Sequence, residues 1–409
     1  MPSDTLPRRI LLADADAFFV AVARLADPEG AGAAPLLIVG GSRESRGVVC
    51  SASYPVRRYG VRSGMSIAQA LRLCPEAMCV PVPRGACVKT SHAIGRVLKR
   101  FAPVVEGASI DEWYLDLAGT ERLYREEPLS ATAQRIREAV HAETGFSVSI
   151  GGGTSKLVAK LAAQIAKPTP DGEPLGVYVV APGDEPDFVL QFALADIPLI
   201  GPALRERLDR AGLRTVAAVR AQSREELSRW LGEREARWLY ERVRGLDAAP
   251  VEQREVPQSI SREETFARDI ASDAVLERQL LALVVHAAAD LRATQMTART
   301  VRVKLRDADF TTRQASRTLP EPVVADRVIY ATARALLRGL RRARRTPARL
   351  IGINLSSLAV DPSPVQLALF DSESAQLESN RDRAIARAVD ELRARFGPDA
   401  ILPAELLRE

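Results

Sequence analysis

The sequence predicts an α+β fold divided among several domains, and three observations favour it. At 409 residues, the chain exceeds the size that usually forms one hydrophobic core. Apolar runs with the period of a strand and runs with the period of a helix are mixed along most of the chain. Residues 224–244, by contrast, carry only the helical period, with leucines and tryptophans on one face. We therefore expect mixed domains joined to one all-helical domain.

Composition excludes several classes of protein. The apolar runs are too short to cross a bilayer, and no signal peptide is visible. The four cysteines form no C-x-x-C pair and have no clustered histidines, which argues against a zinc site and for reduced thiols. We therefore expect a cytoplasmic protein that does not contact a membrane.

The positive charge is concentrated near the C-terminal end. Residues 291–350 contain fifteen Lys or Arg against four acids, a local charge of +11, whereas the whole chain carries +5. Such asymmetry is typical of a surface that binds a polyanion. The alternative is a solubilising face, although such a face usually mixes both signs.

Two adjacent acids, Asp111 and Glu112, lie between apolar runs over residues 102–108 and 113–117 that read as strands. Side chains of neighbouring strand residues point to opposite faces, so both acids can reach one site only at a turn. We expect a hairpin with both acids at its tip. Close carboxylates need a cation between them, and oxygen ligands without histidine favour Mg²⁺. The alternative is two solvated acids in a loop.

A third acid follows the first predicted strand, over residues 9–13. Asp14 ends this strand, and Asp16 comes two residues later, where it either binds metal or caps the next helix. Asp14 in the same sheet as the hairpin would give three carboxylates around a pair of divalent ions. That arrangement serves in-line phosphoryl transfer.

Four motifs occur in the order found in Y-family translesion DNA polymerases, and the chain most resembles the DNA polymerase IV, or DinB, branch over roughly residues 8 to 360. The motifs are Asp14-x-Asp-x-Phe-Phe, Tyr54-Pro-Val-Arg followed by Tyr59-Gly-Val-Arg-Ser-Gly-Met, Ser109-Ile-Asp-Glu-Trp-Tyr-Leu-Asp, and Ser155-Lys through Ala166-Lys-Pro. The resemblance implies a right-hand polymerase with a palm, small fingers, an all-helical thumb and a four-stranded little finger. The implied boundaries are 1–19 and 80–183 for the palm, 20–79 for the fingers, 184–246 for the thumb, 247–257 for a linker, 258–360 for the little finger and 361–409 for a tail.

The resemblance also implies roles for single residues. Asp14, Asp111 and Glu112 would be the catalytic acids and would bind two Mg²⁺ ions, with the backbone carbonyl of Ala15 as a further ligand. Phe19 would be a steric gate that excludes a ribose 2′-hydroxyl, whereas Phe18 reads as core. The triphosphate of the incoming dNTP would be held by Ser51, Tyr54, Arg57 and Lys167. Without the motif, Arg57 and Arg58 would read as a solvated pair.

Two segments are candidates for binding primer-template DNA. Residues 195–212 resemble a helix-hairpin-helix, in which amides near Gly201 would bind a phosphate, although Leu199 stands where the family often has glycine. In residues 301–306 the period is two, so Arg302, Lys304 and Arg306 should face outward from a sheet. Gly151-Gly-Gly-Thr-Ser-Lys lacks the ending of a Walker A loop and reads as a strand-to-helix turn capped by Thr154 or Ser155.

The tail contains Gln366-Leu367-Ala-Leu369-Phe370, which resembles the peptide that binds the bacterial sliding clamp, with Leu369 and Phe370 as anchors. After it, Ile385, Ala388, Val389, Leu392 and Phe396 mark one helical face whose partner the sequence leaves open. We expect a monomeric, template-directed DNA polymerase. The alternatives are a nucleotidyl cyclase with a similar metal site, and a non-catalytic DNA-binding adaptor to the clamp.

Overall fold

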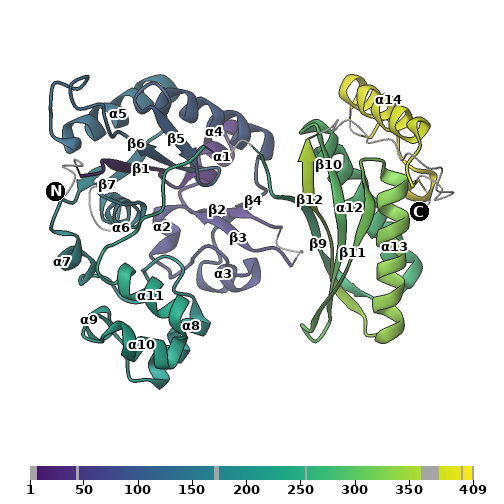
Figure 1. Ribbon diagram of the computed structural model, residues 1–409. Coiled ribbons are helices and arrows are strands. Elements are labelled where there is room, and N and C mark those ends of the chain that lie inside the picture. The colour runs from purple at the N-terminus through teal and green to yellow at the C-terminus, as the bar shows by residue number, and fades with distance from the viewer. Residues whose placement is uncertain are drawn as a thin grey trace, which may run out of the picture. The chain divides into compact units, whose positions relative to one another are not determined.

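The computed structural model describes residues 7–42, 46–169, 175–253, 256–360, 377–397 and 399–407. The chain forms two compact units, one of Met1–Arg43 with Gly47–Arg254 and one of Glu44–Arg46 with Glu255–Glu409 (Figure 1). Both units combine helices with a β-sheet, as the sequence predicts. Among the described residues, none of the helices is both long and apolar enough to span a bilayer.

A five-stranded sheet forms the centre of the first unit, with its strands in the order β5-β6-β1-β7-β8. The strands are β1 (Ile10–Ala15), β5 (Val104–Gly107), β6 (Glu112–Asp116), β7 (Val148–Gly153) and β8 (Val177–Val179). β1 is buried along its whole length because helices cover both faces of the sheet. On one face, Leu11 and Ala13 pack against α1 (Phe18–Ala26), α4 (Arg84–Leu98) and α5 (Leu129–Thr144). On the other, Ile10 and Leu12 pack against α6 (Lys156–Ala166).

The three glycines at 151–153 lie within β7 and do not form the turn that the sequence predicts. Gly151 lets α6 approach the sheet, since a Cβ on this residue would lie 2.0 Å from the Ala163 nitrogen and 2.2 Å from the Ala159 oxygen. The turn comes one residue later. Ser155 caps α6 by accepting a hydrogen bond from the Val158 nitrogen at 3.2 Å, so this part of the prediction is confirmed.

Gly151→Ala should lower the free energy of unfolding of the first unit by about 3 kcal/mol, because the new methyl would overlap the backbone of α6. Denaturant melts would measure the change. The matched control is Gly85→Ala in α4, where a Cβ meets nothing within 4 Å and alanine favours the helix. Equal stability of the two variants would contradict the close packing described here.

A three-stranded sheet, in the order β3-β2-β4, lies in the segment predicted as fingers. Its strands are β2 (Leu37–Gly40), β3 (Val49–Ala52) and β4 (Met78–Val80), and its helices are α2 (Tyr54–Arg57) and α3 (Ile67–Leu73). Ser66 caps α3 by accepting a hydrogen bond from the Gln69 nitrogen at 3.2 Å. Ile38, Val49, Val56 and Ile67 form the core that joins sheet and helices.

The all-helical segment predicted after residue 184 contains five helices. They are α7 (Glu185–Val189), α8 (Pro202–Arg210), α9 (Val216–Arg220), α10 (Arg224–Leu231) and α11 (Glu233–Arg242). Leu227, Leu231 and Leu239 are buried in their shared core, which confirms the predicted inward face, whereas Trp230 is 45% exposed.

The segment that was expected to begin the linker packs against the first unit. Val251 is buried beside Ile10 and Leu12 of β1. The Glu106 carboxylate accepts hydrogen bonds from the Glu252 nitrogen at 2.9 Å and from Lys156 Nζ at 2.7 Å. Residues 247–252 are therefore part of the first unit's structure, and the free connection is shorter than the sequence indicates.

The second unit contains a four-stranded antiparallel sheet in the order β11-β10-β12-β9 with helices on one face (Figure 1). All six predicted elements are confirmed, as β9 (Ser259–Ile270), α12 (Asp273–Ala293), β10 (Met296–Asp307), β11 (Thr312–Val323), α13 (Asp326–Ala343) and β12 (Ala348–Val360). Val301, Val303 and Leu305 are buried against the helices, which confirms the predicted period of two.

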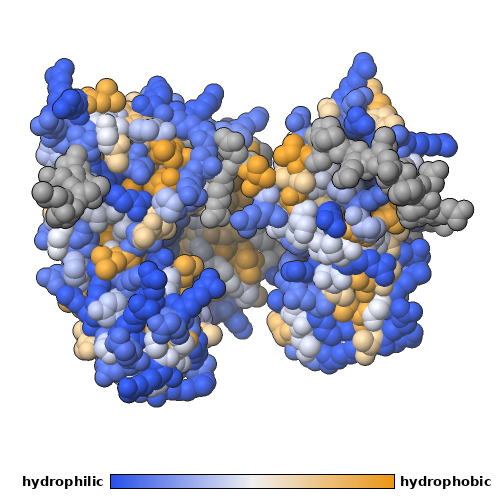
Figure 2. Space-filling model, in the orientation of Figure 1, coloured by the Kyte–Doolittle hydropathy of each residue, from blue (hydrophilic) through white to orange (hydrophobic). Residues whose placement is uncertain are grey.

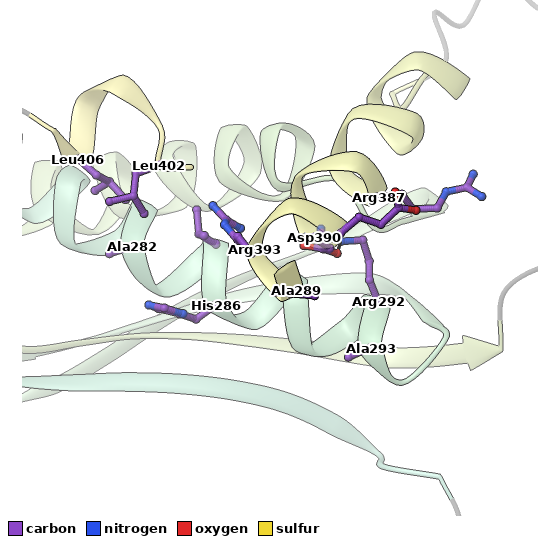
Figure 3. Close-up of a pocket in the computed structure, with 13 residues that line it drawn as sticks. Ala282, His286, Ala289, Arg292, Ala293, Arg387, Asp390, Arg393, Leu402 and Leu406 are labelled. Atoms are coloured by element: carbon purple, nitrogen blue, oxygen red, sulfur yellow. Dashed lines mark hydrogen bonds and ion pairs between the residues drawn. The ribbon is translucent and has the colours of Figure 1, made fainter. Parts of the chain in front are cut away.

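The tail helix α14 (Asn380–Phe396) packs on the helical side of the second unit. Asp390 pairs with Arg292 of α12 at 2.5 Å and 2.8 Å, and Asp382 pairs with Arg327 of α13 at 2.8 Å. Figure 3 shows Arg292 and Asp390 meeting across a cavity of about 580 Å³ between α14 and α12. The predicted apolar face is only partly covered, since Phe396 is 63% exposed and Ile385 is 53% exposed. The segment with Gln366 to Phe370 lies outside the described residues.

Candidate active site

The predicted acids meet where three strands of the central sheet end. β1 pairs with β6 so that Asp14 lies directly opposite Glu112. β5 and β6 form the predicted hairpin, and the Ala108 nitrogen donates a hydrogen bond to the backbone carbonyl oxygen of Glu112 at 2.9 Å. Asp111 lies in the turn, where its backbone oxygen accepts a hydrogen bond from the Ala15 nitrogen at 2.9 Å. The β1–β6 pairing thus brings Asp14 beside the adjacent acids Asp111 and Glu112, about a hundred residues later in the sequence.

Each carboxylate has its own partner. Lys167 Nζ lies 2.6 Å from Asp14 Oδ2, Lys160 Nζ contacts Glu112, and the Asp111 carboxylate accepts a hydrogen bond from the Ser109 hydroxyl. Like charges in one buried site repel, so these donors stabilise the acids individually.

Burial and the nearby Glu112 raise the pKa of Asp14 to about 7, although Lys167 opposes the change. Burial also acts to raise the pKa of Glu112, but hydrogen bonds from Lys160 and Asp14 outweigh it and the pKa falls. The pair therefore favours one proton or one further cation between its oxygens.

A hard divalent cation fits this donor set. The available ligands are carboxylate oxygens and a backbone carbonyl, which Mg²⁺ prefers. In the described part of the chain, no group of three or more His, Cys, Asp or Glu side chains is gathered closely enough to hold a metal ion, and the Asp111 carboxylate is hydrogen-bonded to Ser109. Asp14 and Glu112 form the assembled part of the site, and Asp111 lines the same cavity.

This cavity has a volume of about 550 Å³ and opens beside the acids. Six of the predicted residues line it together with Asp14, and they come from strands, helices and turns of the first unit: Ala15, Phe19, Ser51, Arg57, Asp111 and Lys167. Phe19 packs edge-on against Phe18 with ring centroids 5.5 Å apart, and Phe18 is buried core as expected. The cavity is therefore lined by both acidic and basic side chains.

Arg57 is held in position by two contacts. Its Nε donates to the Ala52 oxygen at 2.9 Å, and its guanidinium lies 4.6 Å from the centroid of the Tyr54 ring. Burial, followed by the charge of Asp16, raises the pKa of Tyr54 to about 12, so this side chain keeps its hydroxyl proton. Tyr54 supports Arg57 and is not itself among the residues that line the cavity.

Asp16 does not cap α1, so that alternative is wrong. The N-cap position belongs to Ala17, which has a positive φ of 45°. Asp16 instead accepts a hydrogen bond from the Ser149 hydroxyl at 2.7 Å, and burial raises its pKa. It therefore anchors the turn between β1 and α1.

The sequence did not reveal three residues of the site. Lys160 contacts Glu112, and Arg62 and Ser63 line the cavity. The only available signal for Lys160 is its spacing of four from Lys156, which places both lysines on one face of α6. Arg62 lies inside the Tyr59-Gly-Val-Arg motif, but the motif does not indicate that Arg62 lines the cavity while Arg58 does not.

The predicted helix-hairpin-helix has an unusual backbone at Leu199. Gly201 is the N-cap of α8, and Pro202 occupies its first turn, so the amides at the start of α8 are unhindered by side-chain caps. Leu199 has a positive φ of 71° and is 78% exposed. A glycine would adopt this conformation without strain.

Leu199→Gly should raise the free energy of unfolding by about 0.5–1 kcal/mol, because it relieves the left-handed conformation and loses little packing. Thermal melts of the full chain would measure the gain. Leu199→Ala keeps a Cβ and should show no such gain. A lower melting temperature for the glycine variant would mean that the leucine side chain contributes packing.

The outer face of the second unit's sheet is polar. Arg302, Lys304 and Arg306 alternate with buried residues along β10, as predicted. Ser316, Gln314 and Thr312 stand opposite them on β11. Lys304 forms an ion pair with Glu263 at 3.0 Å, and several arginines of the basic segment pair with acids outside it, such as Arg338 with Glu277. The excess of +11 is therefore partly neutralised, and hydroxyl and amide groups make up much of the face.

Comparisons with known proteins identify the family. Residues 13–164 match the impB/mucB/samB family, residues 257–369 its C-terminal domain, and residues 195–247 the thumb domain of DNA polymerase-iota. The DNA polymerase IV of Desulfatibacillum aliphaticivorans is 34% identical over 400 residues, which cover 98% of this chain and 97% of that protein. The chain belongs to the Y-family of DNA polymerases, in the DNA polymerase IV branch.

Other Y-family relatives agree. The DNA polymerase IV of Halorhodospira halophila is 37% identical over 353 residues, which cover 86% of this chain and 95% of that protein. A solved Y-family polymerase chimera of Dbh and Dpo4 shares the fold with a TM-score of 0.75 at 24% identity, covering 86% of this chain and all of that one. The predicted right-hand polymerase fold is confirmed, and the cyclase alternative is wrong. Nothing favours the adaptor alternative.

Proposed function

We propose that the chain is a DNA-directed DNA polymerase that copies damaged templates, transferring a nucleotide from dNTP to a primer 3′-hydroxyl with two Mg²⁺ ions. The observation that carries the proposal is the pairing of Asp14 with Glu112 across β1 and β6, beside a cavity that Asp14, Asp111, Arg57 and Lys167 line. Carboxylates can bind the metal ions that assist phosphoryl transfer, and cationic side chains can bind the triphosphate. Family membership supports the same reaction.

The acids hold the reacting groups in position. The oxygen ligands would be Asp14, Asp111, Glu112 and the Ala15 carbonyl, and bound Mg²⁺ would lower the pKa of the 3′-hydroxyl and neutralise the leaving pyrophosphate. Lys167, which forms an ion pair with Asp14 in this structure, would donate hydrogen bonds to triphosphate oxygens. Lys160 of α6 forms an ion pair with Glu112 and keeps that carboxylate in position. Arg57, fixed by Ala52 and Tyr54, offers a planar fork to the phosphates, with Ser51 beside it.

The DNA would be held by its backbone. The outer face with Arg302, Lys304 and Arg306 presents cations among hydroxyl groups, which suits phosphates and no particular base sequence. Amides at the start of α8, after Gly201, would add one phosphate contact. Binding should therefore weaken as salt rises.

Primer extension tests the function directly. The chain should extend a primer on an intact template and insert a nucleotide opposite an abasic site, in each case only with a divalent ion present. A replicative polymerase on the same two templates is the control. Efficient copying of the intact template with no insertion opposite the damaged site would refute the translesion part of the proposal.

The peptide Gln366-Leu367-Ala-Leu369-Phe370 is proposed to tether the monomeric polymerase to the sliding clamp in the cytoplasm. Alanine at Leu369 and Phe370 should abolish stimulation by the clamp and spare clamp-free synthesis, because tethering raises the local concentration of primer ends. Primer extension with and without the clamp measures this. Alanine at Ser372 and Ser374 is the matched control. Equal stimulation of all variants would disprove the tether.

A further inference from the structure

A groove in the first unit, the α4 groove, lies between α4 and the hairpin of β5 and β6. Its volume is about 440 Å³, and it shares no lining residue with the candidate active-site cavity. No acid is among the described residues that line it. From α4 and its C-terminal end come Ser91, His92, Arg96 and Lys99, and from the hairpin come Gly107 and Trp113. None of the proposed catalytic steps uses this groove.

The rim of the α4 groove is basic. His92, Arg96 and Lys99 are exposed, and their spacings of four and three place them on one side of α4. None of the three forms an ion pair with a described residue, whereas the adjacent Arg100 pairs with Glu143 of α5. Hydrophilic side chains cover most of the surface visible in Figure 2, so exposed cations alone would indicate only a solvated face.

The floor of the groove provides an independent observation. Trp113 is 5% exposed and Ser91 is 9% exposed, yet neither the indole Nε1–H nor the Ser91 hydroxyl has a hydrogen-bond partner in the described part of the chain. Neither atom is fully enclosed. A Cβ on Gly95 would lie 3.4 Å from Trp113 Nε1, and one on Gly107 would lie 3.9 Å from Cδ1, so two glycines leave this edge of the indole open to the groove. Buried donors normally have partners, and these two therefore indicate a ligand that accepts hydrogen bonds.

Recessed donors below a basic rim without acids suit the oxygens of a phosphate group. The basic side of α4 begins at the exposed Lys89 and extends roughly 15 Å to Lys99, and α4 contains no acid, which favours a chain of phosphates over one small anion. Trp113 exposes too little of its ring to stack on a base. We propose that the α4 groove and this side of α4 bind the phosphate backbone of a DNA strand, where the choice of DNA rests on the proposed polymerase function.

Fluorescence anisotropy of a labelled single strand of about 16 nucleotides measures binding to the full chain without dNTP or divalent ions. Arg96→Gln with Lys99→Gln should weaken the affinity about tenfold at low salt. The slope of log affinity against log salt should fall by about 1.4, because each phosphate contact on a single strand contributes about 0.7.

The matched control is Arg122→Gln with Arg125→Gln, which removes an equal charge from exposed residues outside the groove and should leave the affinity and the slope unchanged. Equal affinities and salt slopes for the two double variants would overturn the proposal.

A second measurement reports on the floor of the groove itself. The chain has three tryptophans, so labelling them with ¹⁵N gives three indole signals, and Trp113→Phe identifies the signal of Trp113. The same DNA strand should move this signal downfield, because the N–H would donate to a phosphate. A signal that stays in place at saturating DNA would overturn the proposal, as would an equal shift with inorganic phosphate at the same concentration of phosphate groups. Neither measurement involves synthesis, so primer extension tests the proposed function separately.

Discussion

Asp14→Asn should reduce primer extension by about 10³-fold, measured as single-turnover incorporation at saturating dNTP. The substitution keeps the shape of the side chain but removes the negative charge that faces Glu112 across β1 and β6. With that charge gone, the donor set loses a ligand for a divalent ion. Binding of primer-template DNA should be unchanged, because the proposed DNA contacts lie elsewhere.

The matched control is Asp116→Asn, at the other end of β6. Asp116 accepts a hydrogen bond from the Ala118 nitrogen at 2.9 Å and does not line the active-site cavity, so synthesis should continue almost normally. Wild-type rates for Asp14→Asn, with an inactive Asp116→Asn, would rule out the proposed catalytic site.

Phe19→Ala should raise the incorporation of ribonucleotides relative to deoxyribonucleotides by about 100-fold. Phe19 lines the cavity between the acids and Arg57, and its ring is fixed edge-on against the buried Phe18. A fixed ring can exclude a 2′-hydroxyl by contact, whereas alanine leaves room for it. Competition between rNTP and dNTP in primer extension measures the ratio.

Phe19→Tyr keeps the ring and should retain selectivity for deoxyribonucleotides. Incorporation of dNTP should remain measurable in both variants, which separates loss of selectivity from loss of folding. An alanine variant that still rejects ribonucleotides as strongly as wild type would remove Phe19 from the proposed role.

The sequence could predict elements whose signals are local. The β10 strand carries its alternation within a few residues, and the Asp111-Glu112 hairpin is bounded by apolar runs on both sides. The pairing of Asp14 with Glu112 followed from placing two acids at strand ends of one sheet. These predictions depended on short patterns that only one local structure can accommodate.

Two other contacts between distant residues could not be predicted in this way. Lys160 reaches Glu112 only because α6 packs closely against the sheet. That close packing depends on Gly151, which the sequence analysis assigned to a strand-to-helix turn. Val251 looks like a linker residue in sequence, yet it completes a cluster with Ile10 and Leu12. In both cases the partner is fixed by packing and not by spacing along the chain.

Anchoring of Val251 and Glu252 on the first unit limits how far the second unit can travel. Only residues 253–258 separate Glu252, held by Glu106, from Ser259 at the start of β9. Six extended residues span roughly 20 Å. A short connection thus joins the first unit to the sheet that is proposed to bind DNA, and breaking the contact between Glu106 and Glu252 would lengthen that connection.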